Sequence, residues 1–163
     1  MSTGIRIAAT LLVSGSLGLG SAMYFYGSGS AEANGPWRIW ISRVMPNQSP
    51  YALAHYALRG EVAPDTNQMI VFTAATDSDG AALNAACAYA VSGSMPPSRW
   101  WSLAVAGDDA AALSSGHVIT GPDGAFSAQA SRMATPGNWL RLNPDQDKFE
   151  LVLRFHGPAG LLK

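Results

Sequence analysis

The residues with the clearest potential for chemistry lie in the segment Thr76–Gly80, where Asp77, Asp79 and Gly80 follow the D-x-D-G pattern that opens a calcium-binding loop. Such a loop ends in an acidic ligand, and no glutamate follows this segment until Glu150. The same residues suit a turn, because Asp and Ser side chains accept hydrogen bonds from nearby backbone N–H groups and glycine adopts positive φ angles. We therefore predict a turn at this position and no metal ligands.

The other residue types that serve catalysis form no recognisable set. His55, His117 and His156 fall on three different predicted elements without the spacing of metal ligands. The acidic pair Asp108-Asp109 lies in a predicted loop and is typical of a solvated turn. The chain contains no G-x-S-x-G, H-E-x-x-H or P-loop motif. We predict no catalytic, metal-binding or cofactor-binding residues, although residues distant in the sequence can still converge in the fold.

Tryptophans are the candidates for a ligand or partner surface. Alternation along the predicted strand Arg99–Val105 places Trp101 on the face of the apolar residues that follow it and Trp100 on the opposite face. Trp100 either stacks on a sugar or a partner, or packs under a loop or helix. Trp37 and Trp40 stand beside arginines, so they suit either lipid headgroups or a first strand of the domain.

The elements that would position these residues are mainly strands. Runs with period-two alternation or continuous apolar character, separated by turn residues, predict a β-sandwich or jelly-roll-like domain with one short helix. The turn Gly121–Gly124 is of the x-P-D-G type and joins two arms of a hairpin. The predicted strands are Met69–Ala75, Ala86–Val91, Arg99–Val105, Gly116–Thr120, Ala125–Ser131, Asn138–Leu142 and Phe149–Phe155. In the second of these, Cys87 falls on the bulkier face, where we expect a buried and inert thiol.

The short helix begins at Ser49-Pro50, because serine caps free N–H groups and proline suits the first helical position. Gly60 follows as the residue that ends it. An apolar stripe at helical spacing is expected to face the core, and His55 and Arg59 share a solvated face. The stripe consists of Leu53, Ala54, Ala57 and Leu58.

An uncharged apolar segment, Ile7–Tyr26, opens the chain. Its roughly twenty residues would form a helix about 30 Å long, the thickness of a bilayer's hydrocarbon core. Arg6 precedes it and an aromatic group closes it, as at a lipid–water interface. A retained anchor is favoured over a cleaved signal peptide because the apolar run is long, but Ala31-Glu32-Ala33 offers a cleavage site and keeps the alternative open.

We therefore divide the chain into a membrane anchor or signal segment (residues 1–26), a flexible linker (27–36) and a β-rich domain (37–163). The positive-inside count is nearly balanced, yet a short N-terminal tail before a long exported domain favours a single-pass inner-membrane protein with its domain in the periplasm. Lipid would contact residues 7–26. Ser14, Gly18 and Ala22 form a small-residue stripe where another helix could approach.

Composition excludes several functional classes. Only 13% of the 163 residues are charged and the net charge is −1, with two lysines, so the clustered basic face of a nucleic-acid-binding protein is absent. The single cysteine rules out an intrachain disulfide. Apolar residues make up 48% of the chain, enough for one domain with a core.

The stretch from Ser49 to Pro158 resembles the domain of unknown function 1214 family. The resemblance rests on the order and spacing of SPYALAHYALRG, TDSDG, PPSRWWSLAV, PDG, GNWLRL and FELVLRFHGP. It implies a compact β-sandwich, in a family spread through bacterial envelope and hypothetical proteins, many of which carry a larger companion domain where this chain has its apolar segment. It brings no catalytic residues, and it gives only structural weight to Asp77, Asp79, Gly80, Trp101, Asn138 and Trp139.

From these features we expect a membrane-tethered, extracytoplasmic interaction or scaffold module of the bacterial cell envelope, with an envelope protein as partner and no catalysis. A carbohydrate- or lipid-binding module that uses Trp100, or the segment with Trp37 and Trp40, is the alternative. An envelope hydrolase is less favoured.

Overall fold

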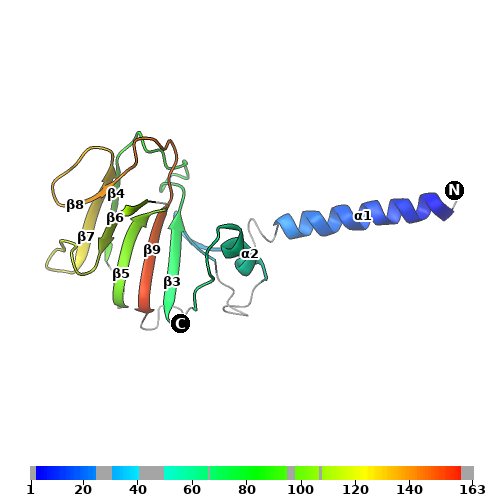
Figure 1. Ribbon diagram of the computed structural model, residues 1–163, viewed down its shortest axis with the longest axis horizontal. Helices are drawn as coiled ribbons and strands as arrows, with labels where there is room; N and C mark the ends of the chain where they lie inside the picture. Colours follow the sequence, from blue (N-terminus) through cyan, green and yellow to red (C-terminus); the bar gives the residue numbers. More distant parts are fainter. Residues whose placement is uncertain are drawn as a thin grey trace. The chain divides into compact units, whose positions relative to one another are not determined.

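The computed structural model describes residues 3–24, 31–40, 50–65, 67–94, 98–106 and 108–158, and consists of two helices and nine strands (Figure 1). Parts of the sequence predictions fall outside these ranges: the aromatic end at Phe25 and Tyr26, and the N-cap Ser49. The chain divides into two compact units, Met1–Ala31 with Trp40–Ala63, and Glu32–Ile39 with Pro64–Lys163.

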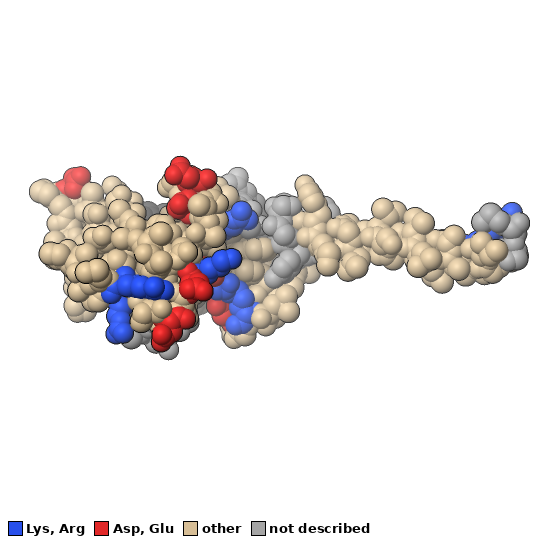
Figure 2. Space-filling model, turned by 90° about the horizontal axis from the view of Figure 1, so that it is seen from above, with Lys and Arg blue, Asp and Glu red and all other residues tan. Residues whose placement is uncertain are grey.

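Helix α1 (Thr3–Tyr24) contains most of the predicted apolar segment. Its mean hydropathy of 1.4 and its length of 22 residues are those of a helix able to cross a membrane, and none of its residues is buried. Figure 2 shows the helix without charged residues except near its N-terminal end, where Arg6 lies.

Helix α2 (Pro50–Leu58) ends as the sequence predicts. Gly60, with φ of 69°, donates its N–H to the carbonyl of Ala57, and Glu61 donates to the carbonyl of Tyr56, which together form a Schellman motif. The predicted apolar stripe is wrong, because Leu58 is 77% exposed while Ala52 and Tyr56 are buried. Ala52 and Tyr56 are four residues apart, as are Ala54 and Leu58 of the predicted stripe. Helical spacing therefore fits both faces of α2 and does not by itself show which one is buried.

The larger sheet has six strands in the order β1-β2-β3-β9-β5-β6. β3 pairs antiparallel with β9, and β9 with β5, which places β9, with eight residues one of the two longest strands, at the centre of the sheet. Strand β1 lies within the segment expected to be a linker. The bounds are β1 Ala31–Asn34, β2 Trp37–Trp40, β3 Met69–Ala74, β5 Ser98–Val105, β6 Asp108–Ser114 and β9 Leu151–Pro158.

The smaller sheet has three strands, β4 (Tyr89–Ser94), β7 (Ala125–Ser131) and β8 (Asn138–Arg141), in the order β4-β7-β8. β4 and β7 are antiparallel, whereas β7 and β8 are parallel although only residues 132–137 connect them. Parallel neighbours ordinarily need a crossover of a dozen or more residues. The short connection works because β8 restarts beside the middle of β7, where Asn138 lies opposite Ala128.

The core lies between the inner faces of the two sheets. Trp101, Leu103 and Val105 of β5 are buried there, and the ring of Trp101 lies 5.2 Å from that of Phe126 on β7. Ala128 and Ala130 are also buried while Ser127 and Gln129 are exposed, as alternation predicts. The β-sandwich with one short helix and an apolar N-terminal helix is therefore confirmed.

Three local predictions are wrong. Cys87 is exposed, because Asn84 to Cys87 form a turn in which the Asn84 side chain accepts a hydrogen bond from the N–H of Ala86, and β4 begins only at Tyr89. Asp108 and the residues that follow it form β6 rather than a loop, because they pair with β5 around a bulge. Gly116–Thr120 forms no strand and contributes one isolated bridge, between Thr120 and Phe126.

The Asn138 side chain holds the start of β8 in place. Its amide nitrogen donates to the carbonyls of Ile119 (2.7 Å) and Ser127 (2.9 Å), and its amide oxygen accepts from the N–H of Ile119 (2.7 Å). Asn138 is only 9% exposed, so these groups have little access to water.

Replacing Asn138 by alanine should lower the free energy of unfolding by roughly 2 to 4 kcal/mol, because it leaves three buried or partly buried backbone groups without partners. Urea unfolding followed by tryptophan fluorescence measures the loss. Asn67→Ala is the matched control, since the exposed Asn67 amide bonds only to nearby Asp65, and it should cost less than about 1 kcal/mol. Equal effects of the two substitutions would contradict this role for Asn138.

Tyr56 makes the free energy of unfolding depend on pH in the alkaline range. Burial raises the pKa of its phenol from the usual 10.0 to about 12, with a further increase from the negative charge of Glu61 and an opposing effect of Arg59. The unfolded chain loses this proton first, so the stability that the buried phenol contributes is complete below pH 10 and is lost as the pH rises toward 12. Tyr56→Phe should remove up to roughly 3 kcal/mol of that dependence, as measured by unfolding at stepped pH. Identical slopes for both chains between pH 10 and 12 would disprove it.

Candidate functional site

The segment Thr76–Gly80 is a turn, as predicted. One carboxylate oxygen of Asp77 accepts hydrogen bonds from the N–H groups of Asp79 (3.0 Å) and Ala81 (2.9 Å). Gly80 has a φ of 85° and donates its N–H to the carbonyl of Asp77. Asp77 therefore organises the turn from within, and Gly80 supplies a backbone conformation that other residues rarely adopt.

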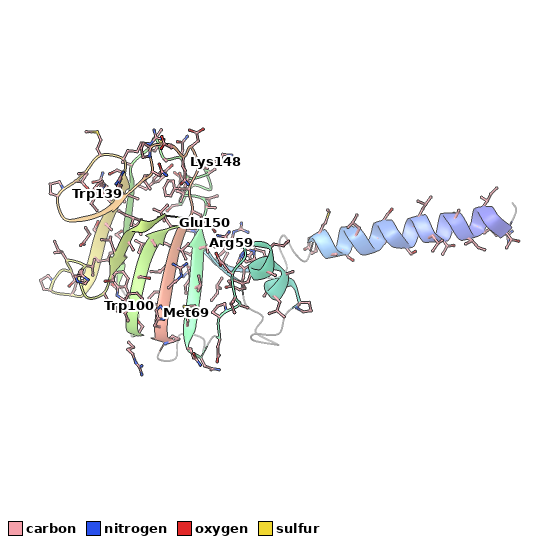
Figure 3. The ribbon with its side chains drawn as sticks, viewed as in Figure 1. Arg59, Met69, Trp100, Trp139, Lys148 and Glu150 are labelled. Carbon is pink, nitrogen blue, oxygen red and sulfur yellow. The ribbon has the colours of Figure 1, made fainter. Side chains whose placement is uncertain are left out.

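Trp100 is the exposed aromatic residue of the larger sheet. It stands on the outer face of β5, 41% exposed, and its ring lies 4.9 Å from the imidazole of His156 on β9 in a tilted arrangement. The register aligns Trp100, His156 and Met69 in one row across β5, β9 and β3. Figure 3 shows Trp100 and Met69 toward the same end of the sheet.

Arg154 lies in the next row of the same face. It stands two residues before His156 on β9, opposite Ser102 of β5 and Val71 of β3, and its side chain is half-buried. We call Trp100, His156, Met69 and Arg154 the outer-face patch. It combines a flat aromatic surface, a flexible thioether and a fixed positive charge.

Gly157 follows His156 near the end of β9 and has a left-handed backbone conformation. Gly157 has a φ of 59°, and a Cβ at that position would lie 3.1 Å from the Cβ of Arg99. Its N–H donates to the carbonyl of Gln68, which continues the pairing with the β3 side. A larger residue at this position would strain the backbone beside the Trp100–His156 contact.

The other two candidate tryptophans do not join the outer-face patch. Trp37 and Trp40 belong to β2, which β3 and β9 separate from β5 by three strand spacings, about 14 Å. Both are half-buried, and Trp40 stacks on the ring of His55 with centroids 3.9 Å apart. This segment forms a strand of the larger sheet, although β1 rather than β2 is the first strand, and His55 lies against an aromatic ring rather than on a solvated face.

Trp101 and Trp139 have structural surroundings. Trp101 is buried in the core, and the indole N–H of Trp139 donates to the carbonyl and the hydroxyl of Ser131 at 3.1 and 3.2 Å. Ser131 in turn donates its hydroxyl to the carbonyl of Met133. Trp139 thus holds the end of β7 beside the connection to β8.

One serine–histidine contact has the elements of a nucleophile and a base. The hydroxyl of Ser114, at the end of β6, lies 3.1 Å from Nδ1 of His117. A catalytic pair of this kind needs an acidic group that orients the histidine, and no described acidic residue bonds to His117. Within the described ranges, no three His, Cys, Asp or Glu side chains gather as metal ligands.

Sequence reasoning missed a groove on the smaller sheet. It has a volume of about 620 Å³ and lies along β7, between the loop of residues 119–125 and Pro136–Asn138. Its polar lining includes Thr120, Asp123, Ser127 and Gln129. Each of these residues fits a turn or an alternating strand when it is considered alone. Their closeness in space follows only from the pairing of β7 with β8, which the sequence pattern does not predict.

Charges of both signs are interspersed on the face of the molecule seen in Figure 2. This face includes no large area of one sign, in agreement with the net charge of −1. Long-range electrostatic attraction of a highly charged partner is therefore not a feature of this surface.

Solved structures share this fold at low identity. The VPA0106 protein from Vibrio parahaemolyticus is 18% identical with a TM-score of 0.55, over 69% of this chain and 32% of that one. An uncharacterised protein from Burkholderia cenocepacia is 16% identical with a TM-score of 0.51, over 85% of this chain and 34% of its own. The chain thus spans about a third of each, and likeness at these identities shows the fold alone. No curated protein matches the chain.

A family model described as "Protein of unknown function (DUF1214)" matches residues 68–160, from just before β3 to just after β9. These residues contain the outer-face patch, the groove and every strand from β3 onward. Because the match spans more than half of the chain, the protein belongs to the DUF1214 family.

Proposed function

We propose that this protein is a membrane-tethered interaction module of the bacterial cell envelope. In this proposal α1 holds the chain in the inner membrane, the β-sandwich lies in the periplasm, and its outer-face patch binds an envelope protein. The exposed Trp100 in the row with His156 and Met69 is the observation that carries it.

The composition of the outer-face patch supports a protein partner. Tryptophan, methionine and arginine are enriched in protein–protein interfaces, and tryptophan and arginine contribute a large share of their binding energy. Trp100 is already held by His156, so less side-chain freedom would be lost on binding than for an isolated exposed residue. Arg154 adds a directional donor next to the aromatic surface.

The N-terminal elements support a retained anchor. α1 has the length and hydropathy of a membrane span, while the alternative cleavage site Ala31-Glu32-Ala33 falls inside β1, which is hydrogen-bonded to β2. Cleavage after Ala33 would remove most of β1 and uncover the edge of β2. The small-residue stripe Ser14, Gly18 and Ala22 offers a close approach to a second helix in the membrane.

A carbohydrate- or lipid-binding module is the second candidate, favoured by the same exposed ring. A tryptophan presented on a flat sheet surface can stack on a sugar ring, and an arginine beside it can bind a phosphate headgroup. In either case the ligand would occupy the outer-face patch.

The anchor is tested by fractionation and by sequencing of the native product. We expect the protein in the inner-membrane fraction, resistant to carbonate extraction, with its N-terminus upstream of α1. A periplasmic reporter fused after Lys163 should be active. A soluble product that begins at Asn34, or activity from a cytoplasmic reporter alone, would disprove the proposed topology.

The patch is tested by purification of the full chain from detergent-solubilised membranes. We expect a stoichiometric envelope protein to co-purify, and Trp100→Ala should weaken its binding by about 30-fold, the effect of an interface residue worth roughly 2 kcal/mol. Met133→Ala removes another large exposed side chain, 80% exposed and distant in the sequence from the patch, and should leave binding unchanged. A chain that purifies alone contradicts the interaction module, whereas glycan or lipid binding that Trp100→Ala abolishes would favour the second candidate.

A further inference from the structure

The groove on the smaller sheet is built from rigid parts. Asn138 joins one wall to the other through its hydrogen bonds to Ile119 and to the carbonyl of Ser127. The Asp123 carboxylate is fixed by a hydrogen bond from the N–H of Ala125 (3.1 Å). It also packs closely against Gly121, since a Cβ on that residue would lie only 2.9 Å from the carboxylate oxygen. The shape of the groove is therefore largely formed before any ligand binds.

The backbone of β7, which runs along the groove, has no free edge to offer. On one side, β4 pairs with every residue from Ala125 to Ala130. On the other side, the loop pairs at Thr120 and Gly121, the Asn138 amide bonds to the carbonyl of Ser127, and β8 pairs with the remaining residues. An extended peptide that binds by strand addition would find no unpaired β7 backbone.

The side chains, by contrast, offer unused hydrogen-bonding groups. Thr120, Ser127 and Gln129 are exposed, and none of their side chains bonds to another described residue. Ser127 and Gln129 stand on the same face of β7, about 7 Å apart, so that one ligand can contact both. Ile119, 65% exposed, adds an apolar wall.

The charges of the lining exclude anionic ligands. Asp123 is its one ionisable residue, and no lysine, arginine or histidine contributes to it. A phosphate or a polyuronate would approach a carboxylate without any compensating cation. Two hydroxyls, an amide and a carboxylate oxygen instead suit a ligand that both donates and accepts through many neutral groups.

We propose that this groove binds an uncharged saccharide. The hydroxyls of a neutral sugar bond to Ser127, Gln129 and Thr120, the Asp123 carboxylate accepts from one of them, and the apolar side of the sugar lies on Ile119. This site is separate from the outer-face patch, which lies on the other sheet.

The test uses the full chain in phosphatidylcholine nanodiscs, which carry no sugar headgroups. The probes are an array of neutral oligosaccharides (glucans, mannans, galactans and N-acetylglucosamine oligomers) printed beside anionic polyuronates. We expect binding to one or more neutral members and none to the polyuronates. The double variant Ser127→Ala/Gln129→Ala should bind at least about tenfold more weakly, because it removes two ligand hydrogen bonds.

The matched control is Ser78→Ala/Gln68→Ala, which removes an exposed serine and an exposed glutamine outside the groove. It should bind as the wild-type chain does, and thermal melting verifies that both variants fold. Trp100→Ala should also leave saccharide binding intact, which separates this result from that of the outer-face patch. Binding to no neutral saccharide, preference for the polyuronates, or loss of binding in Trp100→Ala but not in the groove variant would overturn the proposal.

Discussion

In the smaller sheet, a single side-chain amide, that of Asn138, joins the loop at Ile119 to β7 where β8 does not reach. A parallel partner for β7 must start near the level at which β7 starts, but residues 132–137 are too few for a full crossover. The chain returns only as far as Ala128, which leaves the first half of β7 without a partner from β8. Like a backbone peptide group, the Asn138 side-chain amide offers both a hydrogen-bond donor and an acceptor. It uses both on the backbone of Ile119, and so holds the loop beside the part of β7 that β8 does not reach.

This constraint also creates the groove. Because β8 and the loop at residues 119–121 approach β7 as two separate pieces, their backbones do not form one continuous strand. Pro136 and Gly137 lie on one side of the discontinuity and Ile119 to Gly121 on the other. If one regular strand paired with the whole of β7, its backbone would be continuous and its side chains would be evenly spaced along β7. There would then be no gap between two backbone segments at this place.

Unequal sheets explain the distribution of burial in the core. Neighbouring strands lie about 4.8 Å apart, so the six strands of the larger sheet span about 24 Å and the three of the smaller sheet about 10 Å. The smaller sheet therefore covers less than half of the larger one. The contacts of Trp101 with Phe126 and of Phe149 with Tyr89 place the smaller sheet over β5 and the start of β9. Leu103 is accordingly fully buried, whereas Phe72 of β3, on the same face of the larger sheet, is only half-buried.

The sequence predicted features that depend on local chemistry. Alternation assigned Trp100 and Trp101 to opposite faces, the Asp77 turn followed from its side chain, and Gly60 marked the end of α2. It did not predict features that depend on distant partners. The residues of β6, with two aspartates and three alanines, have little strand propensity and pair only because β5 lies beside them.

Candidate sites show the same limit. Trp100 could be singled out because an adjacent tryptophan pair must point to both faces, but its neighbours His156 and Met69 follow from the register of three strands. Cys87 was misplaced because alanines on either side of it carry no signal for a buried face. The groove needed two non-local facts, the parallel pairing and the Asn138 bonds, and neither leaves a periodic trace in the sequence.

The proposed tether gives weak sites a function that they would lack in free solution. A shallow groove with a few side-chain hydrogen bonds, and a patch centred on one tryptophan, each bury little area, and the cost of lost translational freedom offsets much of what they contribute. A chain anchored through α1 has already lost most of that freedom relative to other components of the same membrane. Binding then depends on an effective concentration set by the anchor and the residues that follow it, and two weak sites on opposite sheets can engage two neighbours at once. If α1 anchors the chain as proposed, proximity would supply the affinity that deep pockets would otherwise have to provide, and modest surfaces would be sufficient.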